Sequence, residues 1–326
     1  MAAIKLQKAL LLPAERGQYV VGEVPVPRPG PKEVLVKVIS AALNPVDWKI
    51  VFPPYSAFIP GYPFITGTDG AGEVVEAGED VTNLQVGDKI LFQGWFANPY
   101  ATLQQFCVVK AEFAARIPNN ITFDQAASVP LGLATVILAL FNQHPNSPHT
   151  LRFKPVWEEG AAAESAGKAA LIAGGASSVG QYAIQVAKFA GYSPIIATAS
   201  PHNSDLLTSL GATYIVDRSL SDVQILASLR DLTGGKPVAF AFDAISSSET
   251  MALAYQALAP GGALAIVLPD VIPAGVKKEG DNKRIADPNP VEVLPSGLAS
   301  AAEGLGRLKN NKVSGKKLIV KPQETA

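Results

Sequence analysis

The sequence predicts an α/β protein of two domains, in which a partly closed antiparallel barrel precedes a doubly wound parallel sheet. A chain of 326 residues is too long for one ordinary core. The first third of the chain reads as short strands separated by Pro and Gly, which is typical of small barrels. From Ala169 onward, short apolar runs alternate with helical patterns, which indicates parallel strands joined by crossover helices.

The composition of the chain excludes several classes of function. Hydrophobic residues make up 48% of the chain, charged residues make up 17%, and the net charge is -1, so nothing favours nucleic acid or an anionic membrane as a partner. No apolar stretch reaches the roughly 18 residues that span a bilayer. The N-terminus lacks a secretory pattern, and the single cysteine, Cys107, allows no internal disulfide. We expect a cytoplasmic protein.

Residues 1–122 are expected to form the barrel-like domain. Residues 34–38 and 72–78 alternate between apolar and polar side chains as strands do, and closely spaced Pro and Gly residues mark the turns. Residues 123–141 then carry apolar side chains at helical spacing, so we expect one helix there.

Residues 123–285 are expected to form the doubly wound domain, and residues 286–326 to return to the first domain. A surface excursion is expected over residues 142–168. Beyond it, we expect strands at residues 169–173, 195–199, 214–216, 239–242 and 263–268, and helices at residues 179–189, 205–210, 222–232 and about 249–258.

A glycine-rich loop lies between the first of these strands and the helix that follows it. The loop reads Gly175-Ala176-Ser177-Ser178-Val179-Gly180, a dinucleotide-binding fingerprint with a serine in place of its second glycine. Backbone N–H groups and the helix dipole favour a pyrophosphate at such a helix start. A glycine-rich turn of any strand–helix–strand unit is the alternative interpretation.

The segment about 20 residues after the loop indicates which dinucleotide is bound. An NAD enzyme places Asp or Glu there, whereas this chain has Ser200, His202 and Asn203, which can donate hydrogen bonds to a 2′-phosphate. The segment therefore predicts NADPH over NADH. Capping of the next helix is an alternative role for Ser200 and Asn203 that can coexist with phosphate binding.

Four motifs in order resemble the medium-chain dehydrogenase/reductase superfamily, over nearly the whole chain. Its zinc-independent quinone oxidoreductases and the fungal trans-acting enoyl reductases are the most similar branches. The motifs are Asn44-Pro45-Val46-Asp47-Trp48-Lys49, the barrel signature that begins Gly67-Thr68-Asp69-Gly70, the glycine-rich loop, and Ser200-Pro201-His202-Asn203. The resemblance implies that residues 1–122 form a GroES-like partly closed barrel that carries catalysis and substrate binding, and that residues 123–285 form a Rossmann domain that binds NADPH.

The resemblance also assigns roles to individual residues. Lys49 and Thr135 are implied as catalytic residues, Lys49 near the cofactor ribose and the developing oxyanion and Thr135 near the nicotinamide. A solvated surface lysine and a helix hydroxyl bonded to its own backbone are the alternatives. Beyond the glycine-rich loop, Lys49 itself and Ser200, His202 and Asn203, the implied cofactor-binding residues are Asn44, Val46, Asp47, Trp48, Arg218, Asp243, Ala244, Ile245, Val313 and Ser314.

The residues that would bind a catalytic zinc ion are absent. Zinc members carry Gly-His-Glu in the barrel signature, where this chain has Gly67-Thr68-Asp69, and the cysteine ligand expected near Asn44 is missing. A catalytic zinc ion needs three Cys, His or carboxylate ligands, and one cysteine cannot form the structural four-cysteine site. We therefore expect no metal.

The predicted activity is hydride transfer from NADPH to an activated double bond of an enoyl thioester, an enone or a quinone. A noncatalytic NADPH-binding sensor or structural protein is the alternative, because fold alone does not fix chemistry. The sequence around Ile285 and Asp287 favours this noncatalytic alternative, because relatives have several dozen more residues there. The family also suggests a polyketide synthase as partner, and a monomer or a homodimer.

Overall fold

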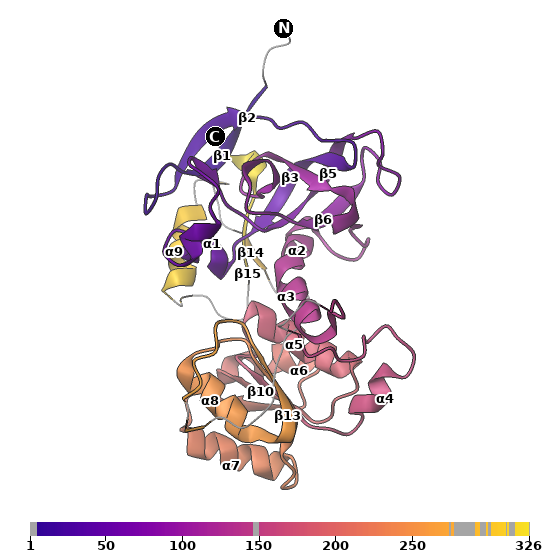
Figure 1. Cartoon of the computed structure of the whole chain (residues 1–326), viewed down its shortest axis with the longest axis vertical. Helices are drawn as coiled ribbons and strands as arrows, with labels where there is room; N and C mark the ends of the chain where they lie inside the picture. The colour runs from indigo at the N-terminus through magenta and orange to yellow at the C-terminus, as the bar shows by residue number, and fades with distance from the viewer. Residues whose placement is uncertain are drawn as a thin grey trace. The chain divides into compact units, whose positions relative to one another are not determined.

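The computed structural model describes residues 5–145, 150–273, 275–276, 291–293, 298, 301–310, 312 and 317–325. The chain divides into two compact units: unit 1 is Met1–Leu131 with Pro290–Ala326, and unit 2 is Gly132–Asn289 (Figure 1). The boundaries proposed from the sequence, at residues 122 and 285, stay predictions. Among the described residues, no helix has the length and apolar character needed to cross a membrane.

Unit 1 is built on two sheets. The smaller has the order β2-β1-β4, and the larger has the order β14-β15-β3-β5-β6-β8, with β7 also paired to β3. Their strands are β1 Leu6–Leu12, β2 Val20–Pro25, β3 Glu33–Ala42, β4 Phe64–Ile65, β5 Asp69–Ala77, β6 Lys89–Gln93, β7 Phe106–Lys110, β8 Ala114–Arg116, β14 Val291–Val293 and β15 Lys317–Val320. The strands β3, β5 and β6 lie side by side in Figure 1.

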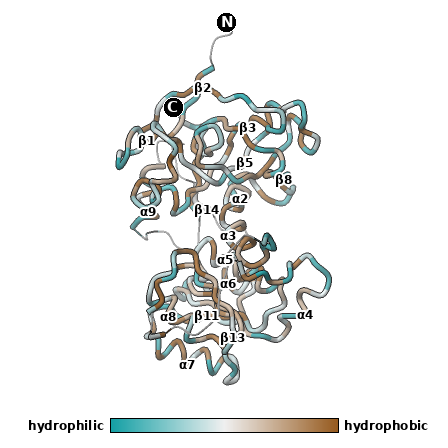
Figure 2. Tube along the Cα trace, viewed as in Figure 1, coloured by the Kyte–Doolittle hydropathy of each residue, from teal (hydrophilic) through white to brown (hydrophobic). Residues whose placement is uncertain are grey.

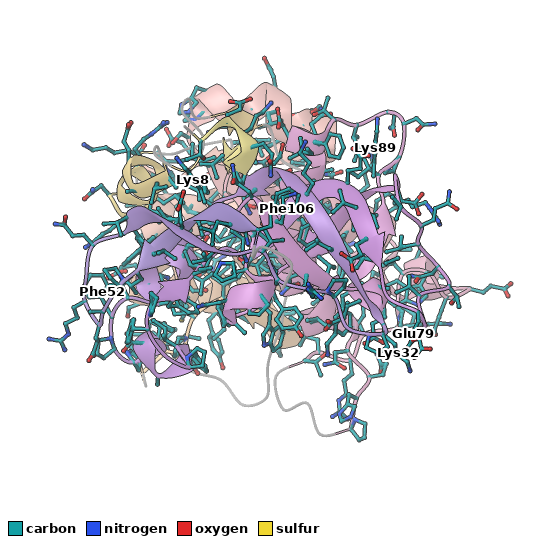
Figure 3. All side chains as sticks on the ribbon, turned by 90° about the horizontal axis from the view of Figure 1, so that it is seen from above. Lys8, Lys32, Phe52, Glu79, Lys89 and Phe106 are labelled. Atoms are coloured by element: carbon teal, nitrogen blue, oxygen red, sulfur yellow. The ribbon has the colours of Figure 1, made fainter. Side chains whose placement is uncertain are left out.

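The two sheets of unit 1 are joined through the segment before β7. Lys8 of β1 donates its backbone N–H to the Gln105 side chain at 2.9 Å, and Leu10 donates to the carbonyl of Leu103 at the same distance. Lys8 and Phe106, labelled in Figure 3, mark these segments. The buried faces of the strands form one core, which includes Val36, Val74 and Ile90.

Among the described residues, the α-helices that belong to unit 1 alone are α1 Pro45–Lys49, α2 Phe123–Ala127 and α9 Ala301–Lys309. The helix α9 lies beside α1 and buries Ala301 and Leu305 in the core of unit 1 (Figure 1). Thr122 caps α2, where its hydroxyl accepts the N–H of Gln125 at 3.2 Å.

The single helix predicted over residues 123–141 is wrong. The chain forms α2 and then a separate helix, α3 Pro130–Phe141. Pro130 has no N–H to continue the hydrogen-bond ladder of α2, and proline favours the first turn of a new helix. Apolar spacing alone did not separate the two helices because both bury one face.

Unit 2 carries a five-stranded parallel sheet in the order β11-β10-β9-β12-β13. Its strands are β9 Ala170–Ala173, β10 Ile195–Ala199, β11 Tyr214–Asp217, β12 Val238–Asp243 and β13 Leu258–Ile266. The order reverses between β9 and β12, and ligands of such sheets bind at the carboxyl ends of the strands at this point. The predicted parallel sheet is therefore confirmed.

Helices cover this sheet and close the core of unit 2. They include α5 Ser178–Phe189, α6 Ser204–Leu210, α7 Asp222–Leu232 and α8 Ser248–Ala257. The helix α4 Ala161–Ser165 lies in the expected excursion. Figure 2 shows hydrophobic and hydrophilic residues alternating along α7, which buries Ile225 and Leu229 against the sheet.

Candidate functional site

The glycine-rich loop of unit 2 connects β9 to α5 with the geometry of a phosphate-binding turn. Ser177 is the N-cap of α5, and its hydroxyl accepts the N–H of Gly180 at 3.0 Å. The loop is anchored to β10, because Gly174 and Gly175 donate their N–H groups to the hydroxyl and the carbonyl of Thr198 at 3.2 and 3.0 Å. Ala176, Ser178 and Val179 are partly exposed on this turn.

Gly180 permits a close backbone approach at the start of α5. A Cβ atom there would lie 2.2 Å from the carbonyl oxygen of Gly174 and 2.9 Å from the Cα of Gly175. Both are backbone atoms, so the loop could not keep its shape around a larger residue. This contact is the helix-to-strand packing that the fingerprint requires of its last glycine.

The segment after β10 presents polar side chains near the same edge of the sheet. Arg218 is exposed at the end of β11, and its Nε donates to the Ser200 hydroxyl at 2.9 Å. His202 is exposed, and its Nε2 lies 3.2 Å from the side-chain nitrogen of the buried Asn203. The segment from Ser200 to Asn203 and Arg218 therefore lie together. The Arg218 guanidinium is held where a phosphate could accept hydrogen bonds from its remaining N–H groups.

Asp243 ends β12 at the switch point of the sheet, and Ala244 and Ile245 follow it. The carboxylate of Asp243 accepts the N–H groups of Ile245 and Ser246, each at 2.9 Å, and the Thr250 hydroxyl at 2.7 Å. Burial raises the pKa of Asp243. Ile245 lies against Gly174, where a Cβ atom would be 2.5 Å from its side chain. Asp243 thus shapes the turn that brings Ile245 to the glycine-rich loop.

In unit 1, Asn44 is the centre of a buried polar network. Its side-chain nitrogen donates to the Thr68 hydroxyl at 3.1 Å and to the Asp69 carboxylate at 2.9 Å, and its side-chain oxygen accepts the Lys317 ammonium at 2.6 Å. Lys317 also contacts Asp69 at 2.8 Å. The backbone N–H of Leu131 donates to the other carboxylate oxygen of Asp69 at 2.5 Å.

Asp47 extends this network into α1. Its carboxylate accepts the backbone N–H of Asn44 at 2.7 Å and the Thr66 hydroxyl at 2.9 Å. Burial, the largest cause, raises the pKa of Asp47 to about 6, and the hydrogen bonds from Asn44 and Thr66 counter part of that rise. The Tyr19 hydroxyl donates to the backbone carbonyl of Asp47 at 2.7 Å. Asn44 and Asp47 therefore direct their polar atoms into the protein.

Trp48 and Lys49, at the end of α1, are partly exposed, as is Val46. The Lys49 ammonium lies 5.8 Å from the centre of the Trp48 ring, and burial lowers its pKa. Lys309 of α9 lies 5.9 Å from the same ring and 4.7 Å from the Phe52 ring. Within the described residues, neither lysine has a carboxylate partner.

Sequence reasoning did not single out Lys317, which joins this network from the far end of the chain. Its side chain is only 3% exposed. Residues 286–326 are predicted only to return to the first domain, and a lysine that directly follows Lys316 carries no sequence signal of burial. Long-range pairing of β15 with β3 brings Lys317 to Asn44, which spacing in the sequence cannot predict.

The other expected residues are placed as follows. Thr135 is a partly exposed residue of α3 in unit 2, whereas Lys49 belongs to unit 1, so the two catalytic candidates are carried by different units. Val313 and Ser314 lie outside the described residues, as does the stretch around Ile285 and Asp287. Across the described ranges, no group of three or more His, Cys, Asp and Glu residues could hold a metal ion.

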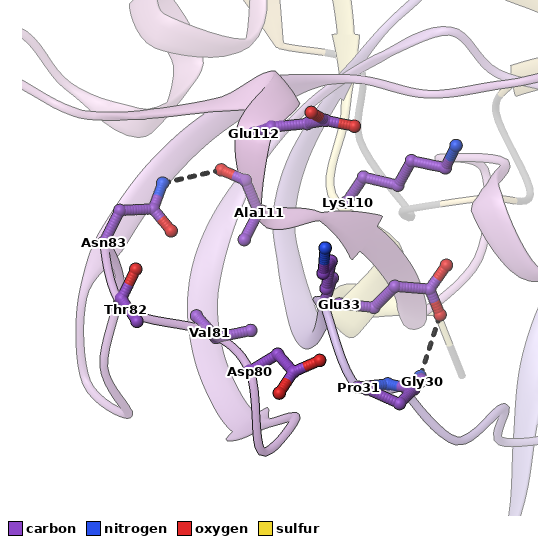
Figure 4. Close-up of a pocket in the computed structure, with 11 residues that line it drawn as sticks. Gly30, Pro31, Glu33, Asp80, Val81, Thr82, Asn83, Lys110, Ala111 and Glu112 are labelled. Carbon is purple, nitrogen blue, oxygen red and sulfur yellow. Dashed lines mark hydrogen bonds between the residues drawn. The ribbon is translucent and has the colours of Figure 1, made fainter.

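A separate surface pocket lies in unit 1, between the loop after β2 and the segment around β7 (Figure 4). Its wall is built by contacts within the chain, because Glu33 accepts the N–H of Gly30 at 2.8 Å and the Asn83 side chain donates to the carbonyl of Ala111 at 2.8 Å. It contains none of the residues predicted to bind cofactor. The pocket therefore adds nothing to either candidate region.

Two family models match the chain, one in each unit. An alcohol dehydrogenase GroES-like domain matches residues 30–119, and a zinc-binding dehydrogenase domain matches residues 178–268. The predicted GroES-like and Rossmann-type domains are thereby confirmed.

Curated relatives match over most of the chain. The trans-enoyl reductase himH of Aspergillus japonicus is 32% identical over 326 residues, which cover 88% of this chain and 89% of that protein. The trans-enoyl reductase traG of Penicillium crustosum is 32% identical over 300 residues, covering 90% and 75%. The dehydrogenase azaJ of Aspergillus niger is 35% identical over 241 residues, which cover 71% of this chain but span only 65% of azaJ.

Solved structures share the fold at lower identity. A quinone oxidoreductase from Coxiella burnetii superposes with a TM-score of 0.76 at 23% identity, covering 97% of this chain and 99% of that one. A crotonyl-CoA carboxylase/reductase gives 0.79 at 20%, covering 98% and 89%. With both domain models in order and the himH match extending over most of both proteins, the chain belongs to the medium-chain dehydrogenase/reductase superfamily.

Proposed function

We infer that the chain is an NADPH-dependent, zinc-independent oxidoreductase that transfers hydride to an activated double bond of a small molecule. One observation carries the cofactor part of the proposal. The exposed Arg218 guanidinium is held by Ser200 beside a glycine-rich helix start, and residues 198–203 contain no carboxylate that would repel a 2′-phosphate. A member of this superfamily with that arrangement is best explained as an NADPH enzyme.

The residues of unit 2 fit a dinucleotide. The pyrophosphate would be held by backbone N–H groups of residues 175–180, and the 2′-phosphate by Ser200, Arg218 and His202. Ile245 beside the glycine-rich loop offers an apolar contact to the nicotinamide side of the cofactor. The bound cofactor supplies the hydride, and the protein supplies binding and orientation.

Lys49 and Thr135 are proposed to assist the chemistry. When hydride adds to carbon of a conjugated acceptor, negative charge moves to the acceptor oxygen, and a nearby cation or hydroxyl stabilises that charge. The Lys49 ammonium is partly exposed and has no carboxylate partner among the described residues, so it can serve this role. We propose Thr135 as a hydroxyl near the nicotinamide, and Asn44 and Asp47 for holding α1 in place.

The donor set in unit 1 supports a mechanism without zinc. Every carboxylate oxygen of Asp47 and Asp69 already accepts a hydrogen bond within the protein. The buried Lys317 ammonium neutralises Asp69 at 2.8 Å, so a metal ion there would stand beside a cation and compete for the same oxygens. Thr68 stands where the zinc members have histidine, and a hydroxyl is a poor zinc ligand.

The acceptor class is proposed from the relatives. Two of them are named trans-enoyl reductases, which favours an enoyl thioester, and the resemblance adds a polyketide synthase as the partner that presents it. Enones and quinones carry the same polarised acceptor and remain part of the proposal.

The test is an acceptor screen with the purified full chain in a chelator. NADPH absorbance is followed with an enoyl thioester, an enone and a quinone in turn. We expect acceptor-dependent NADPH oxidation that chelation leaves intact. If no acceptor is reduced although NADPH binds, the chain is a noncatalytic NADPH-binding protein. If chelation abolishes the activity and zinc alone restores it, the metal-free mechanism is wrong.

A further inference from the structure

We propose that Lys317 is a positioning residue that fixes the start of α1 and thereby places Trp48 and Lys49. The proposal rests on the proposed function only where it concerns activity through Lys49. Lys317 lies more than 260 residues after Lys49 in the sequence, on β15. Its influence on α1 must therefore come through tertiary contacts, and the described structure supplies a continuous chain of them.

The strand pairing puts Lys317 at the right place. The strand β15 runs antiparallel to β3, with Ile319 opposite Ala42, and Leu43 donates its N–H to the carbonyl of Leu318 at 2.9 Å. Continuing this register places Lys317 level with Asn44, where β3 has ended and α1 begins. The C-terminal strand thus places the Lys317 cation beside Asn44, the N-cap of α1.

At that point three side chains form a closed triangle. The Lys317 ammonium contacts the Asn44 oxygen at 2.6 Å and Asp69 at 2.8 Å, and the Asn44 nitrogen donates to the same Asp69 oxygen at 2.9 Å. The cation on one side and the carboxylate on the other allow only one orientation of the Asn44 amide. All three side chains are buried, so the triangle is held in a setting where charged hydrogen bonds are strong.

The triangle is connected to the helix through the backbone N–H of Asn44. Asn44 donates its N–H to the Asp47 carboxylate at 2.7 Å, and Asp47 is one residue before Trp48. With five residues, α1 is far too short to be stable by itself. Its position is therefore set by what holds its first turn, and Lys317 holds Asn44.

A lysine that only neutralised Asp69 would also be buried. Burial therefore does not distinguish the two roles of Lys317, and the experiment must separate them. Asn44→Ala removes the side-chain link between Lys317 and the first turn of α1, and it leaves in place both the backbone N–H that bonds Asp47 and the Lys317–Asp69 pair. Lys317→Met removes both the connection and the charge. If Lys317 acts through α1, both variants disturb Trp48 and Lys49, whereas neutralisation alone predicts a defect only in Lys317→Met.

The first readout needs no acceptor and so stands even if the proposed activity fails. Trp95 and Trp157, each 65% exposed, are replaced by Phe so that Trp48 is the only tryptophan, which is excited selectively over tyrosine. We expect acrylamide to quench Trp48 more strongly in Asn44→Ala and in Lys317→Met. Lys321→Met is the matched control, because Lys321 follows the same strand and pairs with Asp124 instead. Unchanged quenching in a folded Asn44→Ala chain would overturn the proposal, whether or not Lys317→Met folds.

The second readout is a double-mutant cycle with Lys49→Ala on an acceptor found in the screen. We expect Asn44→Ala and Lys317→Met each to lower kcat/KM at least about ten-fold in the parent chain. In the Lys49→Ala background, each should cost less than about three-fold, because the residue that they position is gone. Losses that multiply independently would contradict positioning through Lys49.

Discussion

The polar network of unit 1 and the polar segment of unit 2 differ in how completely their groups are satisfied. Asn44, Asp69 and Lys317 are buried and exchange their hydrogen bonds with one another. Arg218 and His202 are exposed, and the hydrogen bond from the Arg218 side chain to Ser200 uses only its Nε. This difference indicates that buried side chains that bond one another hold the scaffold together. An exposed side chain at a strand end that has further N–H donors is available to bind a ligand.

Breaking the closed network should have the largest effect on stability. Lys317→Met leaves the Asp69 carboxylate buried without its cation, and removing one partner of a buried pair typically costs about 3–5 kcal/mol. Urea unfolding measures this loss. Arg116→Met is the matched control, because the exposed Arg116–Asp88 pair has the same 2.8 Å separation. Equal losses in the two variants would mean that burial does not set the strength of the Lys317–Asp69 pair.

A change in the glycine-rich loop should act on cofactor binding. Gly180→Ala places a methyl group 2.2 Å from the Gly174 carbonyl, so the loop must move. We expect NADPH to bind at least about ten-fold more weakly by calorimetry, since overpacking typically costs 1–3 kcal/mol. Gly61→Ala is the control, because nothing lies within 4 Å of its added Cβ. NADPH affinity that is unaffected by Gly180→Ala would remove the loop from the cofactor site.

Lys49→Ala should lower kcat/KM at least about ten-fold, because a lost hydrogen bond to a charged group costs about 1.5–3 kcal/mol. A loss in NADPH binding would identify Lys49 as a cofactor ligand, and a loss in kcat at saturating NADPH would show that it assists the chemistry. A fully active variant would make Lys49 an ordinary surface lysine.

The smallest expected effect is a pH dependence due to Asp47. Its pKa is raised to about 6 in the folded chain, so the fold disfavours the ionised form. The contribution of Asp47 to stability is therefore greatest below about pH 4 and is lost as the pH rises from about 4 to about 6. Asp47→Asn should lack this decline. The free energy of unfolding of the parent chain should therefore fall relative to that of the variant as the pH rises from about 4 to about 6. An identical pH profile in variant and parent would show that Asp47 does not titrate in this range.

Local patterns predicted unit 2 more fully than unit 1. The glycine-rich loop and the segment from Ser200 to Asn203 are continuous in sequence, so their chemistry could be read directly. The network of unit 1 joins residues 44, 69 and 317, which only the pairing of β15 with β3 and of β3 with β5 brings together. Pro130 was visible in the sequence, yet the apolar periodicity on both sides of it favoured one helix over two.

The most direct test of the account is the affinity of the chain for NADPH and NADH, measured by calorimetry. The exposed Arg218 held by Ser200 should give NADPH at least a ten-fold advantage, since a charged hydrogen bond to the 2′-phosphate is worth about 1.5–3 kcal/mol. Ser200→Asp should weaken NADPH by like-charge repulsion and leave NADH less affected. Equal affinities in the parent chain, or a larger loss for NADH in the variant, would contradict the account.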